Sequence, residues 1–278
     1  MPWLKLVGGL RYDIYNAQVW NSLNFTNQTG STTAASVNQT DTFTSVRAGA
    51  IFEPTPEQSY YVSYSTSFNP SLENLTATTG FQTLPPENNQ GMEVGGKYDL
   101  LKGNLSLTGA LFQITKFNAR TANLDGTFTP QGNVRVQGAR AGVAGRITPE
   151  WQVFGGYAYL NARIIDGIGV GTTGMVPLNT PRDSANIWTT YTINETWQLG
   201  GGAFYTGQRY ANNTNTVTVP EFTRFDLTAA YIQPKWDLRL NVYNVFNTMF
   251  YDALIASDGG RAVPGSGTTG FITLNYRL

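Results

Sequence analysis

The sequence predicts an all-β protein, a transmembrane antiparallel up-and-down β-barrel of about twelve strands with short periplasmic turns and long extracellular loops. Three observations support this fold class: segments of alternating polarity, alternation of short and long connections, and charges confined to one face of each segment. Near the C-terminus, Ile272, Leu274 and Tyr276 fall on one face and Thr273 and Asn275 on the other. Because side chains alternate between the faces of a strand, each segment has one apolar and one polar face.

Segments with this alternation occur along the whole chain. In water the pattern would form a sandwich or barrel around an apolar core, whereas in an outer membrane the apolar faces contact lipid. The predicted strands are 3–15, 42–53, 59–68, 90–99, 104–117, 133–147, 151–164, 184–193, 197–209, 221–232, 236–247 and 267–278.

The connections between these strands fall into two length classes that alternate. Tight turns followed by long loops are typical of transmembrane barrels, whereas a soluble sandwich has no such regular alternation. The short connections are 54–58, 100–103, 148–150, 194–196 and 233–235, and the long ones are 16–41, 69–89, 118–132, 165–183, 210–220 and 248–266.

Three of the short turns are near repeats, and each is followed at once by a tryptophan. Trp151, Trp197 and Trp236 are the first residues after these turns, so they should lie at one height around a barrel. Amphipathic rings are favoured at the lipid headgroups, where they form an aromatic girdle. A soluble β protein with three core tryptophans is the alternative, and it leaves the distribution of charge unexplained.

The polar faces of the predicted strands carry almost all of the charge. A lysine or arginine that faces lipid at mid-bilayer costs about 2–4 kcal/mol, so this segregation is expected of a membrane barrel. Both signs of charge occur, which predicts cross-strand ion pairs lining a hydrated interior. The predicted lumen charges are Arg11, Arg47, Glu93, Lys97, Arg140, Arg146, Arg224, Asp226, Asp237 and Arg239.

Composition narrows the possible functions. Charged residues make up 13% of the chain and the formal net charge is zero, so no nucleic-acid partner is indicated. The chain has no cysteine and no histidine, which excludes disulfides, histidine-based catalysis and histidine metal sites. We therefore predict no metal site, no catalytic residue and no enzymatic activity. Residues 1–10 fit a strand rather than a signal peptide, so any targeting segment is expected outside this chain.

Seven short runs along the chain, taken together and in order, are characteristic. They are 6–13 (LVGGLRYD), 64–70 (YSTSFNP), 85–87 (PPE) leading into 92–97 (MEVGGK), 110–116 (ALFQITK), 156–162 (GYAYLNA), 179–181 (NTP) before 188–191 (WTTY), and 240–247 (LNVYNVFN). These runs resemble strands of TonB-dependent outer-membrane receptors, especially the ferric-siderophore branch. No single run is specific, but their order along the chain strengthens the resemblance.

The resemblance is to the C-terminal half of a twenty-two-stranded barrel, so residues 1–278 are expected to form a single transmembrane barrel domain. It implies a location in the bacterial outer membrane and a ferric siderophore as the transported ligand, with no covalently bound cofactor. It also implies contact with outer-membrane lipid and with the outer-membrane assembly machinery. The TonB complex would act only through a plug that this chain lacks, so energised transport by the chain alone is not expected.

The resemblance further implies that outward loops and the upper lumen bind the iron chelate with aromatic and arginine side chains. The alternative for each such residue is a place in the outer aromatic rim or packing inside its own loop. The candidate ligand-binding residues are Tyr15, Trp20, Phe81, Phe128, Arg209, Tyr210, Phe250, Tyr251 and Arg261.

Family members commonly end in phenylalanine, whereas this chain ends in Tyr276, Arg277 and Leu278.

Two arrangements of the strands stay open at this point. The chain could be part of a larger barrel, or its even number of strands could close on themselves and remove the exposed edges. A self-closing twelve-stranded barrel would be a passive pore. Its selectivity would be set by arginine rings, namely Arg47, Arg140, Arg146, Arg224 and Arg239.

Overall fold

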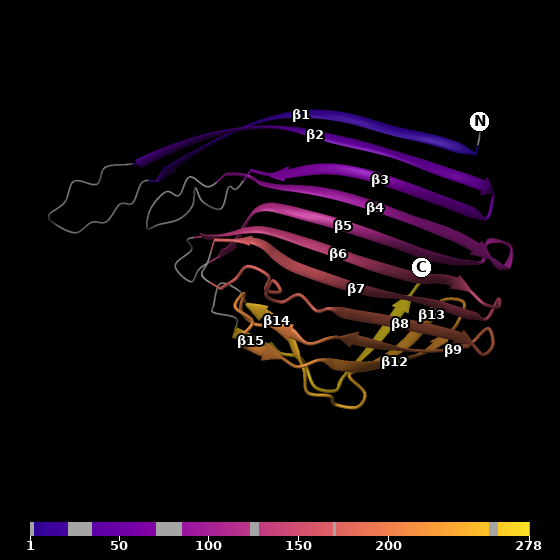
Figure 1. Cartoon of the computed structure of the whole chain (residues 1–278). Coiled ribbons are helices and arrows are strands. Elements are labelled where there is room, and N and C mark those ends of the chain that lie inside the picture. Colours follow the sequence, from indigo (N-terminus) through magenta and orange to yellow (C-terminus); the bar gives the residue numbers. More distant parts are fainter. Residues whose placement is uncertain are drawn as a thin grey trace.

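The computed structural model describes residues 3–21, 35–70, 85–122, 128–168, 171–255 and 261–277. Twelve strands lie side by side in one curved antiparallel sheet (Figure 1). These strands are β1 (Leu4–Asn21), β2 (Ala35–Thr55), β3 (Gln58–Asn69), β4 (Glu87–Leu100), β5 (Leu105–Ala122), β6 (Phe128–Arg146), β7 (Trp151–Gly167), β8 (Asp183–Thr192), β9 (Trp197–Thr206), β12 (Phe222–Ile232), β13 (Trp236–Tyr243) and β16 (Thr269–Tyr276).

Each strand of the sheet pairs with the next in the order β1-β2-β3-β4-β5-β6-β7-β8-β9-β12-β13-β16. This order confirms the predicted up-and-down arrangement. Among the described strands no pairing joins β1 to β16, so the sheet is open and these two strands are its edges. The self-closing alternative is therefore wrong for this structure. Barrel diameter grows with strand number, and closing twelve strands would require a more strongly curved sheet.

The number and order of the predicted strands agree with the structure, but several strand ends do not. β1 and β5 continue to Asn21 and Ala122, beyond the predicted ends at 15 and 117. β13 ends at Tyr243 rather than 247, because Asn244 and Asn247 have φ values of 51°. A positive φ belongs to the left-handed region, which does not continue a strand.

Two small hairpins inside the long connections were not predicted. One pairs β10 (Arg209–Tyr210) with β11 (Thr218–Val219), and the other pairs β14 (Tyr251–Ile255) with β15 (Arg261–Pro264). Figure 1 shows β14 and β15 at the end of the sheet where the long connections lie, which we call the loop end. We call the opposite end of the sheet the turn end.

The apolar face of the sheet is exposed. On it, Leu6 is 78% exposed, Leu10 76% and Ile272 74%, and their neighbours in the register are also apolar. In a water-soluble protein such side chains would be buried, whereas on a membrane barrel they contact lipid. We call this apolar face the outer face and the opposite, polar face the inner face. Within the described part of the chain, no helix is long and apolar enough to cross a membrane.

Candidate functional site

Aromatic side chains mark the turn end of the outer face. Trp151, Trp197 and Trp236 are the first residues of β7, β9 and β13. The register sets each tryptophan opposite a tyrosine of the neighbouring strand, and the ring centroids of Trp197 and Tyr231 are 4.8 Å apart. The three tryptophans therefore share one height, where they could anchor the sheet at a lipid interface.

The inner face carries ion pairs between and along the strands. Arg140 Nη2 lies 2.7 Å from Glu93 Oε1 across β5, and the Tyr61 hydroxyl donates a hydrogen bond to the same carboxylate. The other predicted lumen charges that form ion pairs are Arg11 with Asp13, Lys97 with Asp99, Arg224 with Asp226, and Asp237 with Arg277. The remaining three lie on the same face without an ion pair to any described residue: Arg47, Arg146 and Arg239.

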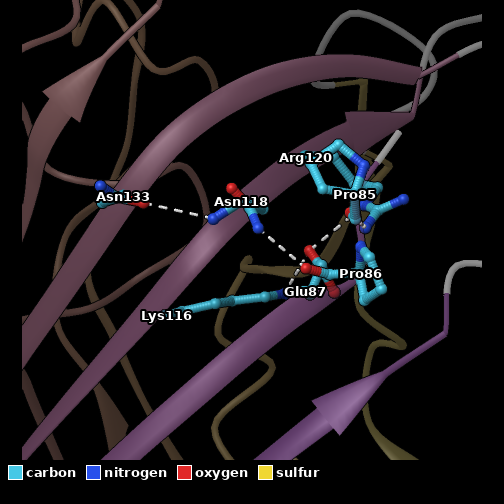
Figure 2. A network of polar contacts seen from close by, with 7 residues as sticks. All are labelled: Pro85, Pro86, Glu87, Lys116, Asn118, Arg120 and Asn133. Atoms are coloured by element: carbon cyan, nitrogen blue, oxygen red, sulfur yellow. Dashed lines mark hydrogen bonds and ion pairs between the residues drawn. The ribbon is translucent and has the colours of Figure 1, made fainter. Parts of the chain in front are cut away.

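At the loop end of the inner face, a buried carboxylate is bound by two cations. Glu87, the first residue of β4, is 6% exposed, and its Oε1 lies 2.8 Å from Lys116 Nζ and 3.6 Å from Arg120 Nε. Figure 2 shows the two cationic side chains converging on Glu87 from β5. We call Glu87, Lys116 and Arg120 the rim cluster. With two cations and one carboxylate, the rim cluster has a net positive charge, which suits it to contact an anionic ligand.

Backbone contacts hold the rim cluster in place. Arg120 Nη2 donates to the carbonyl of Pro85 at 3.0 Å, and Asn118 Nδ2 donates to the carbonyl of Pro86 at 2.9 Å (Figure 2). Asn118 has a φ of 55° at an irregularity of the β5–β6 pairing, and its N–H donates to Asn133 Oδ1 at 3.2 Å. Asparagine tolerates this left-handed conformation, and a bulge redirects the side chains that follow it.

A second cluster joins three of the long connections. Arg209 Nη1 donates to Asn179 Oδ1 at 3.1 Å, and Arg209 Nη2 donates to the carbonyl of Tyr251 at 2.6 Å. Arg209 is 5% exposed, and burial lowers the pKa of its guanidinium while the nearby Asp252 carboxylate opposes that shift. An arginine stays charged even so. It therefore forms two charge-assisted hydrogen bonds that tie β10 to the connections on either side.

Asparagine side chains and a small apolar core add to this junction. Asn215 Nδ2 donates to the carbonyl of Val176 at 2.8 Å, and its Oδ1 accepts the Val176 N–H at 2.9 Å. Asn213 Oδ1 accepts the N–H of Leu178 at 2.9 Å. The apolar core beneath consists of Ala211, Val219, Leu254, Tyr251 and Ala262. We call the folded connections 171–182, 207–221 and 244–255, with β15, the loop module.

Aromatic and charged residues connect the loop module to the inner face. Phe250 is 5% exposed and stacks on Phe222 with ring centroids 4.5 Å apart. The Arg224 guanidinium lies over the rings of Phe204 and Phe250, at 4.9 and 6.0 Å from their centroids. Such cation–π contacts stabilise a partly buried arginine. The lumen charge of Arg224 thus meets the base of the loop module.

Asp226 supports this connection and is 2% exposed. Its carboxylate accepts hydrogen bonds from Arg224 Nε and Nη2 and, at 2.8 Å, from the Asn244 N–H.

We expect Asp226→Leu to lower the free energy of unfolding by about 3–5 kcal/mol, as when one partner of a buried pair is removed. Urea unfolding in detergent would measure this change. Asp13→Leu is the control: because its partner Arg11 is exposed, we expect it to lower the free energy of unfolding by about 1 kcal/mol or less. Equal effects of the two substitutions would contradict this role of Asp226.

The candidate ligand-binding residues are distributed unevenly over these features. Arg209 is buried where it contacts two other connections of the loop module, and Phe250 is buried against Phe222 of β12. Tyr210 and Tyr251 are half-buried in the loop module. Arg261, the first residue of β15, also belongs to the loop module. The other candidates lie apart: Tyr15 half-buried on the inner face of β1 opposite Asp41, Trp20 in β1, and Phe128 at the start of β6. Phe81 lies outside the described residues.

The rim cluster is not predicted as a site by the sequence. Glu87 and Lys116 did occur in runs that carry the family resemblance, 85–87 and 110–116. The predicted long connection 118–132 includes Arg120, whereas this residue lies in β5. The available signal was the alternation of polarity with period two. It sets Glu87 on the same polar face as Glu93, and Lys116 on the polar face of the next strand.

Comparison with known proteins identifies the family. The family described as "TonB dependent receptor-like, beta-barrel" matches residues 1–245. The chain belongs to the TonB-dependent receptors. It is 32% identical over 256 residues to a probable TonB-dependent receptor, BfrD, of Bordetella pertussis, covering 86% of this chain and 34% of that protein. It is 32% identical over 301 residues to the catecholate siderophore receptor Fiu of Escherichia coli K12, covering 99% of this chain and 40% of Fiu.

The solved structures of TonB-dependent receptors have the same fold. The crystal structure of the siderophore receptor PiuA from Acinetobacter baumannii superposes with a TM-score of 0.85 and 30% identity, over 99% of this chain and 41% of PiuA. The chain thus spans about two fifths of the length of such relatives. Receptors of this family are outer-membrane β-barrels, which places the chain in the outer membrane of a Gram-negative bacterium. These relatives are transport receptors rather than enzymes.

Proposed function

We propose that this chain is the C-terminal part of the barrel of an outer-membrane receptor for a ferric siderophore. The observation that carries the proposal is the rim cluster, with two cations on one buried carboxylate at the loop end of the inner face. Ferric chelates of the catecholate class are anionic, and a partly exposed cation at this rim suits them. Relatives named for siderophore uptake support the proposal. Uptake would be energised by the TonB complex acting on a plug domain of the same receptor.

Within this proposal the rim cluster and the loop module have different tasks. The Lys116 side chain is 40% exposed, so its ammonium can contact a ligand while it remains near Glu87. The loop module fixes the position of the half-buried Tyr210 and Tyr251 above the inner face. Aromatic rings and cations together provide the stacking and charge pairing that suit an anionic chelate with aromatic catecholate rings. The passive-pore alternative lacks support, because the sheet is open along β1 and β16.

Lys116→Gln tests the ligand contact. Removing one charge-assisted contact should weaken binding of the ferric siderophore about 10-fold, which corresponds to about 1.4 kcal/mol. Binding would be measured by fluorescence quenching on the receptor isolated from outer membranes. Lys102→Gln, at the turn end, is the matched control and should leave affinity unchanged. Equal affinity of Lys116→Gln and the unmodified receptor would remove Lys116 from the ligand site.

A further inference from the structure

Three arginines break the apolar character of the outer face at the loop end. Arg135 on β6 and Arg163 on β7 are directly opposite each other in the register, and Arg182 immediately precedes β8. All three are exposed. Arg140 points to the inner face of β6 toward Glu93, so Arg135, an odd number of residues away in an unbroken register, points to the outer face.

None of the three arginines forms an ion pair with a carboxylate of the described residues. Arg163 Nη1 donates to the carbonyl of Ala162, and Arg182 Nη2 donates to the Tyr159 hydroxyl, over whose ring the guanidinium lies at 5.1 Å. The nearby Asp183 accepts a hydrogen bond from the Tyr157 hydroxyl at 2.6 Å. Like charges directly opposite on neighbouring strands destabilise a sheet, so Arg135 and Arg163 need a counter-ion from elsewhere.

The position of the arginines along the membrane normal shows which part of the bilayer surrounds them. Arg163 lies twelve residues along β7 from Trp151, which is at the turn-end aromatic row. With a rise of 3.3 Å per residue and a strand tilt near 40°, this separation is about 30 Å along the membrane normal. The apolar band of an outer-membrane barrel is about 25 Å tall. Arg135 and Arg163 are therefore level with the lipid headgroups on the loop side, just beyond the rings of Tyr157 and Tyr159.

We propose that Arg135, Arg163 and Arg182 form a binding site for the phosphate groups of an anionic lipid headgroup in the loop-side leaflet. The planar guanidinium binds phosphate oxygens in a bidentate manner, and two adjacent arginines can bind one phosphate together. Gln113 and Gln137, joined by a 2.8 Å hydrogen bond on the same face, add polar groups for the rest of the headgroup. The site faces lipid and is separate from the rim cluster, and it shares one residue with the loop module, Arg182 at the end of the connection 171–182.

The test uses the protein isolated from outer membranes in mild detergent. Phosphorylated lipid that remains bound would be quantified by mass spectrometry for the unmodified protein and for Arg135→Gln/Arg163→Gln. We expect the double variant to retain at least 10-fold less. The control Lys102→Gln/Lys235→Gln removes the same charge from exposed positions at the turn end and should retain the normal amount. Equal retention by both double variants would overturn the proposal.

A second measurement on the unmodified protein does not depend on the folding of any variant. Vesicles that contain lipid A would be compared with vesicles that contain dephosphorylated lipid A. Tighter binding of the phosphorylated form supports the site, and equal binding overturns it. Inorganic phosphate would then be added as a competitor. Displacement of the lipid by millimolar phosphate would assign the site to free phosphate and overturn the lipid assignment, whereas resistance supports it.

Discussion

Replacing Glu87 with glutamine is expected to open the rim cluster and destabilise the loop ends of β4 and β5 by about 3–5 kcal/mol. The Arg120 side chain is 4% exposed, so loss of the carboxylate leaves a buried cation with Lys116 beside it. Water would have to enter, or the end of β5 would have to separate from Pro85 and Pro86. The free energy of unfolding would be measured by urea titration in detergent.

Glu93→Gln is the matched control for Glu87→Gln. Both glutamates lie on the inner face of β4, but Arg140, the partner of Glu93, is 57% exposed and can be solvated when the carboxylate is neutralised. The expected loss of stability is about 1 kcal/mol or less. If Glu87→Gln were no more destabilising than Glu93→Gln, the rim cluster would not be the buried charge network that we describe. Affinity for a ferric siderophore should change only in Glu87→Gln.

The second large effect is expected from Arg209→Met. The substitution removes two hydrogen bonds from a charged donor, each of which contributes about 1.5–3 kcal/mol, and leaves Asn179 Oδ1 and the Tyr251 carbonyl without that donor. The loop module should separate into independent connections while the sheet remains folded. We expect faster protease cleavage within 171–182 and 207–221, and faster amide exchange there, with unchanged heat-modifiable gel mobility.

Arg209→Lys distinguishes a positioning role from the need for a charge alone. A lysine retains the positive charge, but its single ammonium cannot reproduce the planar fork that reaches both acceptors. Its protease sensitivity should lie between those of Arg209→Met and the unmodified protein. Lys235→Met, at a turn on the opposite end of the sheet, should have no effect. Protection of the loop module in Arg209→Met equal to that of the unmodified protein would refute the positioning role.

The sequence was sufficient to predict the large sheet but not the loop end. Polarity that alternates with period two is a local signal, and it located β7 and β12 to within a few residues. The hairpins β10–β11 and β14–β15 have two to five residues per strand and depend on contacts between distant connections. The alternation of polarity therefore does not predict these two hairpins.

The candidate site divides in the same way. Charges on the inner face followed from alternation, and Glu93 with Arg140 is an example. The inclusion of Arg120 in the rim cluster depends on the left-handed Asn118 and the irregular pairing beside it, which change the path of β5 after Lys116. Arg209 could be recognised as a candidate from its residue type and loop position, but its two acceptors come from other connections.

The order of strands in the sheet has a consequence for how the protein is built. Every strand of the large sheet pairs only with the strands before and after it in that sheet, and the order follows the chain. Each new hairpin can therefore dock on the edge left by the previous one, with only a short segment of chain to close. At each step a new strand pairs with a neighbour in the strand order, and only the last edge would need a distant strand. This order suits insertion into a bilayer one hairpin at a time.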